Sequence, residues 1–349
     1  MKKLIHLILI IVLYTDVISQ NTNDSTLVIL ENQEAELAYN KGIELFNNKQ
    51  YNEAIQAFTE AIKYKPEFIK AYFNRGNVYF ESKDFQNALN DFKKVVQLDS
   101  NDVQALYLTG RCYQILNNKD EAMTYFTKAI EKGSKDARAY YFRGQLYFLN
   151  EQYNEALEDF TSAISFDPKY AVAFNDRGST YRKLEKYDEA INDYKKALEL
   201  NSSLDYTYNN LGSVLRRKEK FDEAIEAYSN AIRINPKNYI AYNNRGSAKF
   251  EKKDYKGAIE DFNKALQIKS DYLPALNNLA AAKIKEKDYK GAVEEFSKII
   301  KNYPDYGYAY MNRGIAYEEL RMQKEACQDW KKAKDLGVKT VETFLSECK

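Results

Sequence analysis

A repeat of 34 residues runs through most of the sequence and constrains the fold more than any other feature. A small residue returns nine times at this interval, at Gly42, Gly76, Gly110, Gly144, Gly178, Gly212, Gly246, Ala280 and Gly314. In every copy an alanine follows twelve residues later and an aromatic residue four after that, from Ala54 with Phe58 to Ala326 with Trp330. Three such columns without an insertion indicate an array of similar structural units.

Each copy has the pattern of two helices joined by a short polar turn. In the first half, apolar residues stand at helical spacing around the glycine, as at Tyr72, Gly76 and Tyr79. Glycine and proline are scarce, with 13 and 5 copies in 349 residues, so little interrupts the helices. Four prolines fall where a second helix must end: Pro66, Pro168, Pro236 and Pro304. The repeat therefore predicts helical hairpins.

These columns of small, alanine and aromatic residues resemble the tetratricopeptide repeat. The resemblance begins at Ala35 and implies an all-α fold, a right-handed superhelical solenoid whose groove is lined by the first helix of each repeat. Nine repeats are expected, at residues 35–68, 69–102, 103–136, 137–170, 171–204, 205–238, 239–272, 273–306 and 307–337. Residues 338–349 are expected to form a C-terminal capping helix, and residues 20–34 a leader before the first repeat.

The N-terminus has the layout of a secretory signal peptide. Two lysines precede an apolar run from Leu4 to Tyr14, and small or tolerated residues lead to a cut before Gln20. The alternative is a membrane anchor, but a run of about 11 apolar residues falls short of the ~20 that span a bilayer. We therefore expect residues 1–19 to be removed and the protein to be exported, with periplasmic and extracellular destinations both open.

Removal of residues 1–19 would change the charge balance and the available chemistry. The remaining chain has equal numbers of basic and acidic residues, whereas a nucleic-acid partner calls for a basic excess. The only histidine, His6, lies in the removed segment, which leaves no imidazole for a catalytic triad or a metal site. No cysteine spacing is typical of a metal site either. We expect a non-enzymatic protein without a cofactor, a metal, a nucleic-acid ligand or a membrane span.

An arginine column stands directly before the glycine and varies together with a later aspartate column. Five repeats carry this arginine and an aspartate sixteen residues later, whereas the four repeats without the arginine lack the aspartate. We interpret the pairs as structural ion pairs between the two helices of one repeat: Arg75 with Asp91, Arg143 with Asp159, Arg177 with Asp193, Arg245 with Asp261, and Arg313 with Asp329. The alternative is a row of arginines that binds acidic ligands.

Asparagines fill much of the two columns before the arginine, although asparagine is a poor residue for a helix interior. The run resembles the first helices of superhelical tetratricopeptide proteins, in which asparagines bind the backbone of an extended peptide. The resemblance implies a peptide-binding groove, to which two tyrosines would add an aromatic section: Asn74, Asn209, Asn210, Asn243, Asn244, Asn277, Asn278, Asn312, Tyr107 and Tyr141. The alternative is a structural ladder of hydrogen bonds between adjacent helices.

The chain has three cysteines. Cys327 opens the last second helix and Cys348 ends the expected capping helix, so a disulfide between them could clamp the C-terminal cap of an exported protein. The sequence does not fix the directions of their side chains. Cys112 lies within a first helix and fits a buried small residue.

Together these features predict a protein-interaction scaffold that binds an extended peptide or a partner segment in its groove. Two other roles remain open, namely a structural component of an envelope or secreted assembly without a groove ligand, and an accessory subunit of an enzyme complex. Fold and repeat number do not identify the partner, because ligand identity depends on a few groove side chains.

Overall fold

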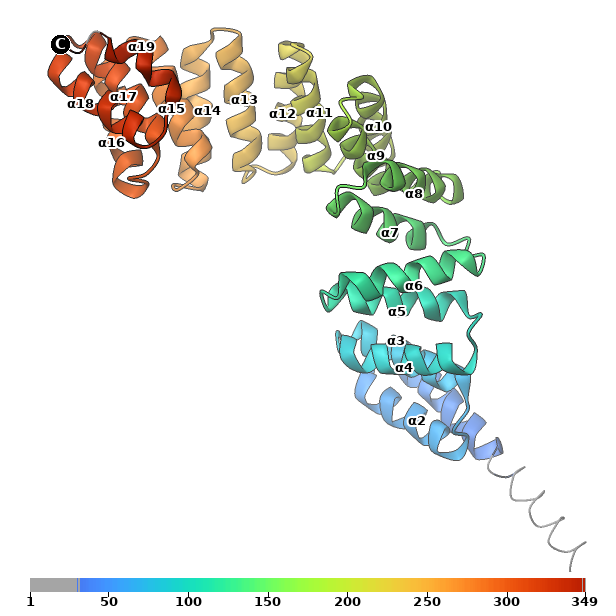
Figure 1. Ribbon diagram of the computed structural model, residues 1–349. Helices are drawn as coiled ribbons and strands as arrows, with labels where there is room; N and C mark the ends of the chain where they lie inside the picture. The colour runs from blue at the N-terminus through green and yellow to red at the C-terminus, as the bar shows by residue number, and fades with distance from the viewer. Residues whose placement is uncertain (1–29, 31, 347, 349) are drawn as a thin grey trace, which may run out of the picture. The chain divides into compact units, whose positions relative to one another are not determined.

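The computed structural model describes residues 30, 32–346 and 348, and these residues form helices and no strand (Figure 1). The expected signal peptide at residues 1–19, His6 within it, and most of the expected leader lie outside the described residues. The helices fall into two compact parts, which we call the N-terminal part, ending at Asp167, and the C-terminal part, Pro168–Lys349. Both parts are arrays of helical hairpins.

In the N-terminal part, residues 32–47 form the first helix, which therefore begins inside the segment expected to be a leader. Good helix formers such as Gln33 and Glu34 extend it in that direction. The helices that follow are α2 (Tyr51–Tyr64), α3 (Ile69–Glu81), α4 (Phe85–Leu98), α5 (Val103–Ile115), α6 (Lys119–Glu131), α7 (Ala137–Leu149) and α8 (Tyr153–Phe166). From α2 to α8, each helix packs against the next along the chain (Figure 1).

The C-terminal part continues the same pattern. Its helices are α9 (Ala171–Lys183), α10 (Tyr187–Leu200), α11 (Asp205–Arg217), α12 (Phe221–Ile234), α13 (Tyr239–Glu251), α14 (Tyr255–Ile268), α15 (Leu273–Lys285), α16 (Tyr289–Asn302), α17 (Gly307–Glu319), α18 (Gln323–Asp335), a 3-10 helix η1 (Lys339–Val341) and α19 (Glu342–Leu345). The first helices of successive repeats, α9, α11, α13, α15 and α17, also contact one another. They therefore line one side of this part.

The small-residue column lets the two helices of a hairpin approach closely. Gly246 in α13 faces Phe262 in α14, and a Cβ atom at Gly246 would lie 2.7 Å from Phe262 Cε1. A larger residue would displace a ring at the centre of the core. The second-helix aromatics fill this space and are fully buried: Phe58, Phe92, Phe126, Phe160, Tyr194, Tyr228, Phe262, Phe296 and Trp330.

The turn within each hairpin depends on a residue in the left-handed conformation. In the seventh repeat Lys253 has φ 63°, its N–H bonds to the carbonyl of Phe250, and the next N–H, of Asp254, bonds to the carbonyl of Lys249. These bonds satisfy the last carbonyls of α13. At the nine turns inside the hairpins this residue is never glycine: Lys49, Lys83, Asn117, Glu151, Glu185, Glu219, Lys253, Lys287 and Arg321.

The C-terminal cap differs from the single helix expected for residues 338–349. After Gly337 the chain forms only the 3-10 helix η1 and the four residues of α19. Thr343 and Ser346 donate hydroxyl hydrogen bonds to backbone carbonyls three residues back, which competes with regular helix formation. The segment still covers the last repeat, because Phe344 stacks on Trp330 with the ring centroids 5.2 Å apart.

Candidate partner-binding face

The arginines before the glycine column form bidentate ion pairs with the aspartates sixteen residues later. Arg245 Nε and Nη2 lie 2.9 Å and 2.6 Å from the two carboxylate oxygens of Asp261. In the other pairs the closest N–O distance is 2.7 Å: Arg75–Asp91, Arg143–Asp159, Arg177–Asp193 and Arg313–Asp329. Burial raises the pKa of Asp91, and the hydrogen bonds from Arg75 oppose that rise by less. These arginines are engaged within the fold and do not form a row that awaits an acidic ligand.

The arginines also reach the preceding repeat, which the sequence interpretation missed. Arg245 Nη1 donates a hydrogen bond to Ser229 Oγ at 3.0 Å. Three other arginines make the same contact: Arg75 with Thr59, Arg143 with Thr127, and Arg313 with Ser297. The signal was present in the sequence as a serine or threonine sixteen residues before each of these arginines. Each of these four arginines therefore joins three helices rather than two.

In the eighth repeat, a glutamate paired with two lysines replaces the arginine–aspartate ion pair. Lys283 Nζ lies 2.9 Å from Glu295 Oε1, and Lys298 Nζ lies 3.1 Å from Glu295 Oε2. Burial raises the pKa of Glu295, but the two lysines together lower it below its ordinary value. Sequence reasoning did not find this pair, although Lys249 stands at the corresponding position one repeat earlier and contacts Asp261.

The asparagine columns form hydrogen bonds between the first helices of adjacent repeats. Asn244 Nδ2 donates to Asn209 Oδ1 at 2.9 Å, and Asn278 Nδ2 donates to Asn243 Oδ1 at 2.9 Å. Asn210 makes the same bond to Asn175 at 3.3 Å. This is the geometry of a structural ladder, the alternative that the sequence left open. Outside these bonds, Asn277 Nδ2 donates to the carbonyl of Leu273 in its own helix. Six asparagines of the two columns are partly exposed: Asn209, Asn210, Asn244, Asn277, Asn278 and Asn312.

Several residues expected to line a groove are placed elsewhere. Tyr107 and Tyr141 are only 4% and 7% exposed and pack against the core rings Phe126 and Phe160. Asn243 is buried within the ladder. In the N-terminal part, Asn74 Nδ2 donates to Tyr39 OH at 2.8 Å. The expectation was wrong for the two tyrosines and Asn243, because these three side chains are buried against neighbouring residues.

A different set of side chains is exposed on the first helices of the C-terminal part. Residues 2, 9 and 12 of a first helix lie on one side of it, because side chains three or seven residues apart lie close together. At the second position Tyr206, Ile240 and Tyr308 are 41%, 40% and 51% exposed. We call these three residues the apolar row. Large apolar side chains exposed in register are uncommon on a surface without a partner, so the row is a candidate contact surface.

A polar row of serines and arginines follows the apolar row along the same helices. Ser179 Oγ lies 3.1 Å from Tyr194 OH, and Tyr228 OH donates to Ser213 Oγ at 3.3 Å. Asn278 Nδ2 donates to Ser247 Oγ of the preceding repeat at 3.3 Å. We use the name first-helix face for the apolar row together with the polar row, which comprises Ser179, Ser213, Ser247, Arg182 and Arg216.

The comparisons with protein families decide what kind of chain this is. Models described as tetratricopeptide repeat match residues 137–170, 171–204, 209–272 and 249–312. A further model, for anaphase-promoting complex, cyclosome, subunit 3, matches residues 47–129. The chain is a tetratricopeptide repeat protein. No curated protein sequence matched it.

Solved structures place the tetratricopeptide repeat array among known solenoids. The chain is similar to a hetero-tetramer structure titled APC/C Cut9-Hcn1, with 15% identity, a TM-score of 0.54, and coverage of 89% of this chain and 75% of that chain. It is also similar to Pseudomonas aeruginosa pilF, with 17% identity, a TM-score of 0.52, and coverage of 59% and 94%. At these identities the likeness establishes the fold alone. A structure of MamA matches with 26% identity and a TM-score of 0.44, over 46% of this chain and 95% of that chain.

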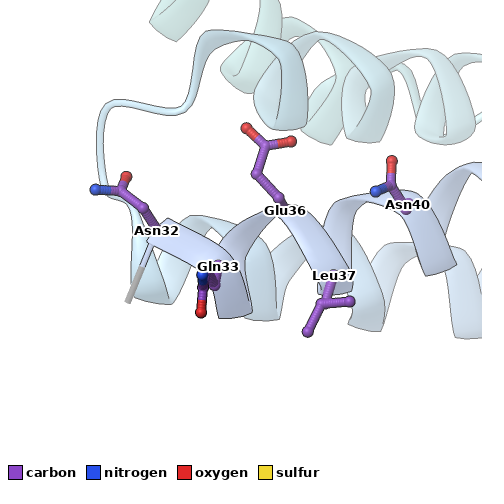
Figure 2. Close-up of a pocket in the computed structure, with 5 residues that line it drawn as sticks. All are labelled: Asn32, Gln33, Glu36, Leu37 and Asn40. Atoms are coloured by element: carbon purple, nitrogen blue, oxygen red, sulfur yellow. The ribbon is translucent and has the colours of Figure 1, made fainter. Parts of the chain in front are cut away.

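The described part of the tetratricopeptide repeat array has neither a cluster typical of a metal site nor a helix suited to span a membrane. Among the described residues, no cluster of histidine, cysteine or carboxylate side chains has the arrangement of a metal site. Over the same residues, no helix combines the length and the apolar character that crossing a membrane requires. The helix of residues 32–47 carries a shallow hollow lined by Asn32, Gln33, Glu36, Leu37 and Asn40. Figure 2 shows that the side chains of Glu36 and Leu37 point to opposite sides of this helix.

The C-terminal end of the array is closed by a disulfide. Cys327 in α18 and Cys348 beyond α19 are bonded, with their Cα atoms 5.6 Å apart. The bond holds the short cap against the buried Trp330. Cys112 is a free, buried thiol in α5.

Proposed function

We propose that this protein is a non-enzymatic scaffold that binds an extended peptide segment of a protein partner on the first-helix face of its C-terminal part. Tetratricopeptide repeat proteins are in general scaffolds for protein interaction, which supports the scaffold role. The observation that supports the binding site is the apolar row, Tyr206, Ile240 and Tyr308, exposed at one position of three first helices. An extended chain that runs across these helices would bury the row and meet the polar row beside it.

The asparagines have a smaller role in this proposal than the sequence suggested. Their amides already bond to one another, so each has fewer donors and acceptors left for a peptide backbone. Removing them would also weaken the contacts between repeats. Partly exposed members such as Asn210 and Asn244 form the edge of the face and supply hydrogen bonds that favour an extended backbone.

The test begins with peptides selected from a random displayed library on the full chain. Selected peptides are titrated against a variant with Tyr206→Ser, Ile240→Ser and Tyr308→Ser. Since burial of one such side chain contributes about 1.5–3 kcal/mol, we expect the affinity to fall at least about tenfold. The matched control is Ile268→Ser with Met322→Ser, which removes exposed apolar side chains away from the face. Equal affinity for wild type and the triple variant would rule out the face as the binding site and favour a structural role without a groove ligand.

We further propose that the protein is exported. The support is the basic and apolar pattern of residues 1–19 together with a disulfide, since disulfides persist in oxidising compartments. Peptide mapping of protein isolated from its source cells tests this proposal. We expect the first detected residue to be Gln20 and the recovered protein to lie outside the cytoplasm; intact residues 1–19 in a cytoplasmic fraction would refute it.

A further inference from the structure

Two arginines on the first-helix face differ from every arginine of the ion-pair column. Arg182 and Arg216 occupy the same position in the last turns of α9 and α11. The Nε atom of each is buried and has no hydrogen-bond partner among the described residues. A buried donor without an acceptor is costly, so native structures rarely keep one without a reason.

The helix ends explain only part of this arrangement. Cations in the last turn of a helix interact favourably with its dipole, which accounts for the neighbouring, exposed Lys183 and Arg217. The dipole does not explain why the guanidinium groups of Arg182 and Arg216 turn inward. Arg182 approaches the hydroxyl of Tyr194, whose pKa is raised by burial and lowered in smaller part by that arginine. A neutral hydroxyl forms a weaker hydrogen bond with a guanidinium than the carboxylate with which a guanidinium normally pairs.

The surface beside Arg216 has room for such a carboxylate. In the fifth and sixth repeats, the core aromatic is a tyrosine whose hydroxyl reaches the serine of the polar row. In the seventh repeat the aromatic is Phe262, which lacks the hydroxyl, and a hollow opens there with Arg216, Ser247 and Asn278 among its lining residues. Of these groups, the guanidinium suits a carboxylate best. The Ser247 hydroxyl and the Asn278 amide already donate to Asn243. Glu251 also lines the hollow and forms no ion pair with Arg216 among the described residues.

We propose that the peptide bound by the first-helix face is acidic, with one side-chain carboxylate at Arg182 and a second at Arg216. This inference rests on the proposed function. Packed helices lie roughly 8–10 Å apart, and a peptide in the extended polyproline II form advances about 3.1 Å per residue with three residues per turn, so side chains three residues apart point to the same side. The two carboxylates therefore belong about three residues apart in the peptide, in the order Asp-x-x-Asp or Glu-x-x-Glu.

The test uses fluorescein-labelled peptides with blocked ends and one common neutral sequence. Three versions carry Asp-x-x-Asp, Asn-x-x-Asn or Lys-x-x-Lys, and each is titrated against the full chain at low and at high salt. Because hydrogen bonds to charged groups are the stronger kind, we expect wild type to bind the aspartate peptide roughly tenfold more tightly than the asparagine peptide. Added salt should reduce this preference, since part of it is electrostatic.

Two variants with the same loss of charge locate the effect. Arg182→Gln with Arg216→Gln should abolish the preference for aspartate. The control Lys195→Gln with Arg233→Gln removes exposed cations from the second helices α10 and α12 and should leave the preference within about twofold of wild type. Circular dichroism shows whether each variant is folded. Should the first pair fail to fold, Arg182→Lys with Arg216→Lys keeps the charge but loses the bidentate geometry, and a weakened preference is then expected.

The outcomes separate this inference from the proposal on which it rests. If the aspartate and asparagine peptides bind equally, and loss of the apolar row weakens both, the face binds peptides and the acidic preference is refuted. If the control pair removes the preference as completely as the arginine pair, general charge is responsible and the assignment to Arg182 and Arg216 is wrong. If neither the arginines nor the apolar row affects any peptide, both proposals fail.

Discussion

At the scale of single residues, burial and partners decide which polar side chains hold the fold and which are available for binding. Asp261 illustrates the first group, because it is buried and accepts hydrogen bonds from Arg245 while Lys249 lies 2.9 Å away. A buried ion pair adds little stability compared with an apolar pair, but removal of one partner leaves the other charge unpaired. The arginine pairs therefore act as fixed joints between helices.

Replacement of these arginines should reveal which aspartates have a second cation. In Arg143→Ala, Asp159 loses its arginine, and the fourth repeat has no lysine at the position that corresponds to Lys249. We therefore expect a loss of about 3–5 kcal/mol in the free energy of unfolding. Arg245→Ala should cost less, because Lys249 still lies 2.9 Å from Asp261. Thermal melting of both variants checks the order. An equal or larger effect at Arg245 would show that Lys249 does not compensate.

The three cysteines should differ in reactivity. Burial raises the pKa of the Cys112 thiol to about 12, so the reactive thiolate is scarce at pH 8. The other two cysteines are joined in a disulfide. Titration with a thiol reagent at pH 8 should therefore detect no thiol in the native protein and one after denaturation without reductant. Three thiols under the second condition would show that Cys327 and Cys348 are not bonded.

At the scale of elements, the helices could be predicted well, because the residues that pack and end each helix stand within it or next to it in the sequence. Gly246 and Ala258 recur at a fixed interval and can only serve close packing, and Pro236 marks where a helix must stop. The turns were harder to predict, because Lys253 and Glu219 adopt a positive φ although neither is glycine, the residue that usually indicates this conformation. The asparagines were harder still, because Asn244 and Asn209 bond across an interval of 35 residues that depends on helix orientation.

The positive-φ turns offer a way to raise stability. Glu219 follows α11 with φ 59°, a conformation that costs a residue with a side chain about 1–2 kcal/mol relative to glycine. We expect Glu219→Gly to stabilise the protein by about 1 kcal/mol, visible as a higher melting temperature. The control is Glu226→Gly, an exposed position inside α12, which should destabilise by about 1 kcal/mol. A lower melting temperature for Glu219→Gly would contradict the expectation.

The fluorescence of Trp330 can report on unfolding of the C-terminal cap. Trp330 is the only tryptophan in the chain, and it stacks on Phe344 beside the disulfide. Cys348→Ser opens a loop whose ends are 21 residues apart, so we expect a loss of roughly 3 kcal/mol for the last repeat and its cap. Tryptophan fluorescence during denaturation should show this loss at a lower denaturant concentration. Reduced wild type should behave like the variant, and an unchanged transition in both would deny the disulfide a stabilising role.

At the scale of the whole molecule, the two parts carry different surfaces on the same repeat. The second position of the first helix is polar in the N-terminal part, with Glu36, Lys70, Gln104 and Arg138, whereas it is apolar at Tyr206 and Ile240 in the C-terminal part. A shared fold therefore does not give a shared partner, and only the C-terminal part has the apolar row. This is also why repeat recognition alone could not place the site, since the columns that define the family are those that pack.

The length of the bound segment follows from the array. The first helices α9 to α17 of the C-terminal part contact one another in order, and packed helices lie roughly 8–10 Å apart, so the face extends over about 40 Å. An extended peptide advances about 3.3 Å per residue, so about twelve residues are needed to reach from the first of these helices to the last. Affinity should therefore rise with peptide length up to about twelve residues and then level off. Truncation series of selected peptides, titrated against wild type and against Tyr308→Ser, check this. For peptides of about six residues that cover only the arginine end, Tyr308→Ser should have no effect. An equal loss for short and long peptides would show that the ligand does not lie along the helices in the extended form.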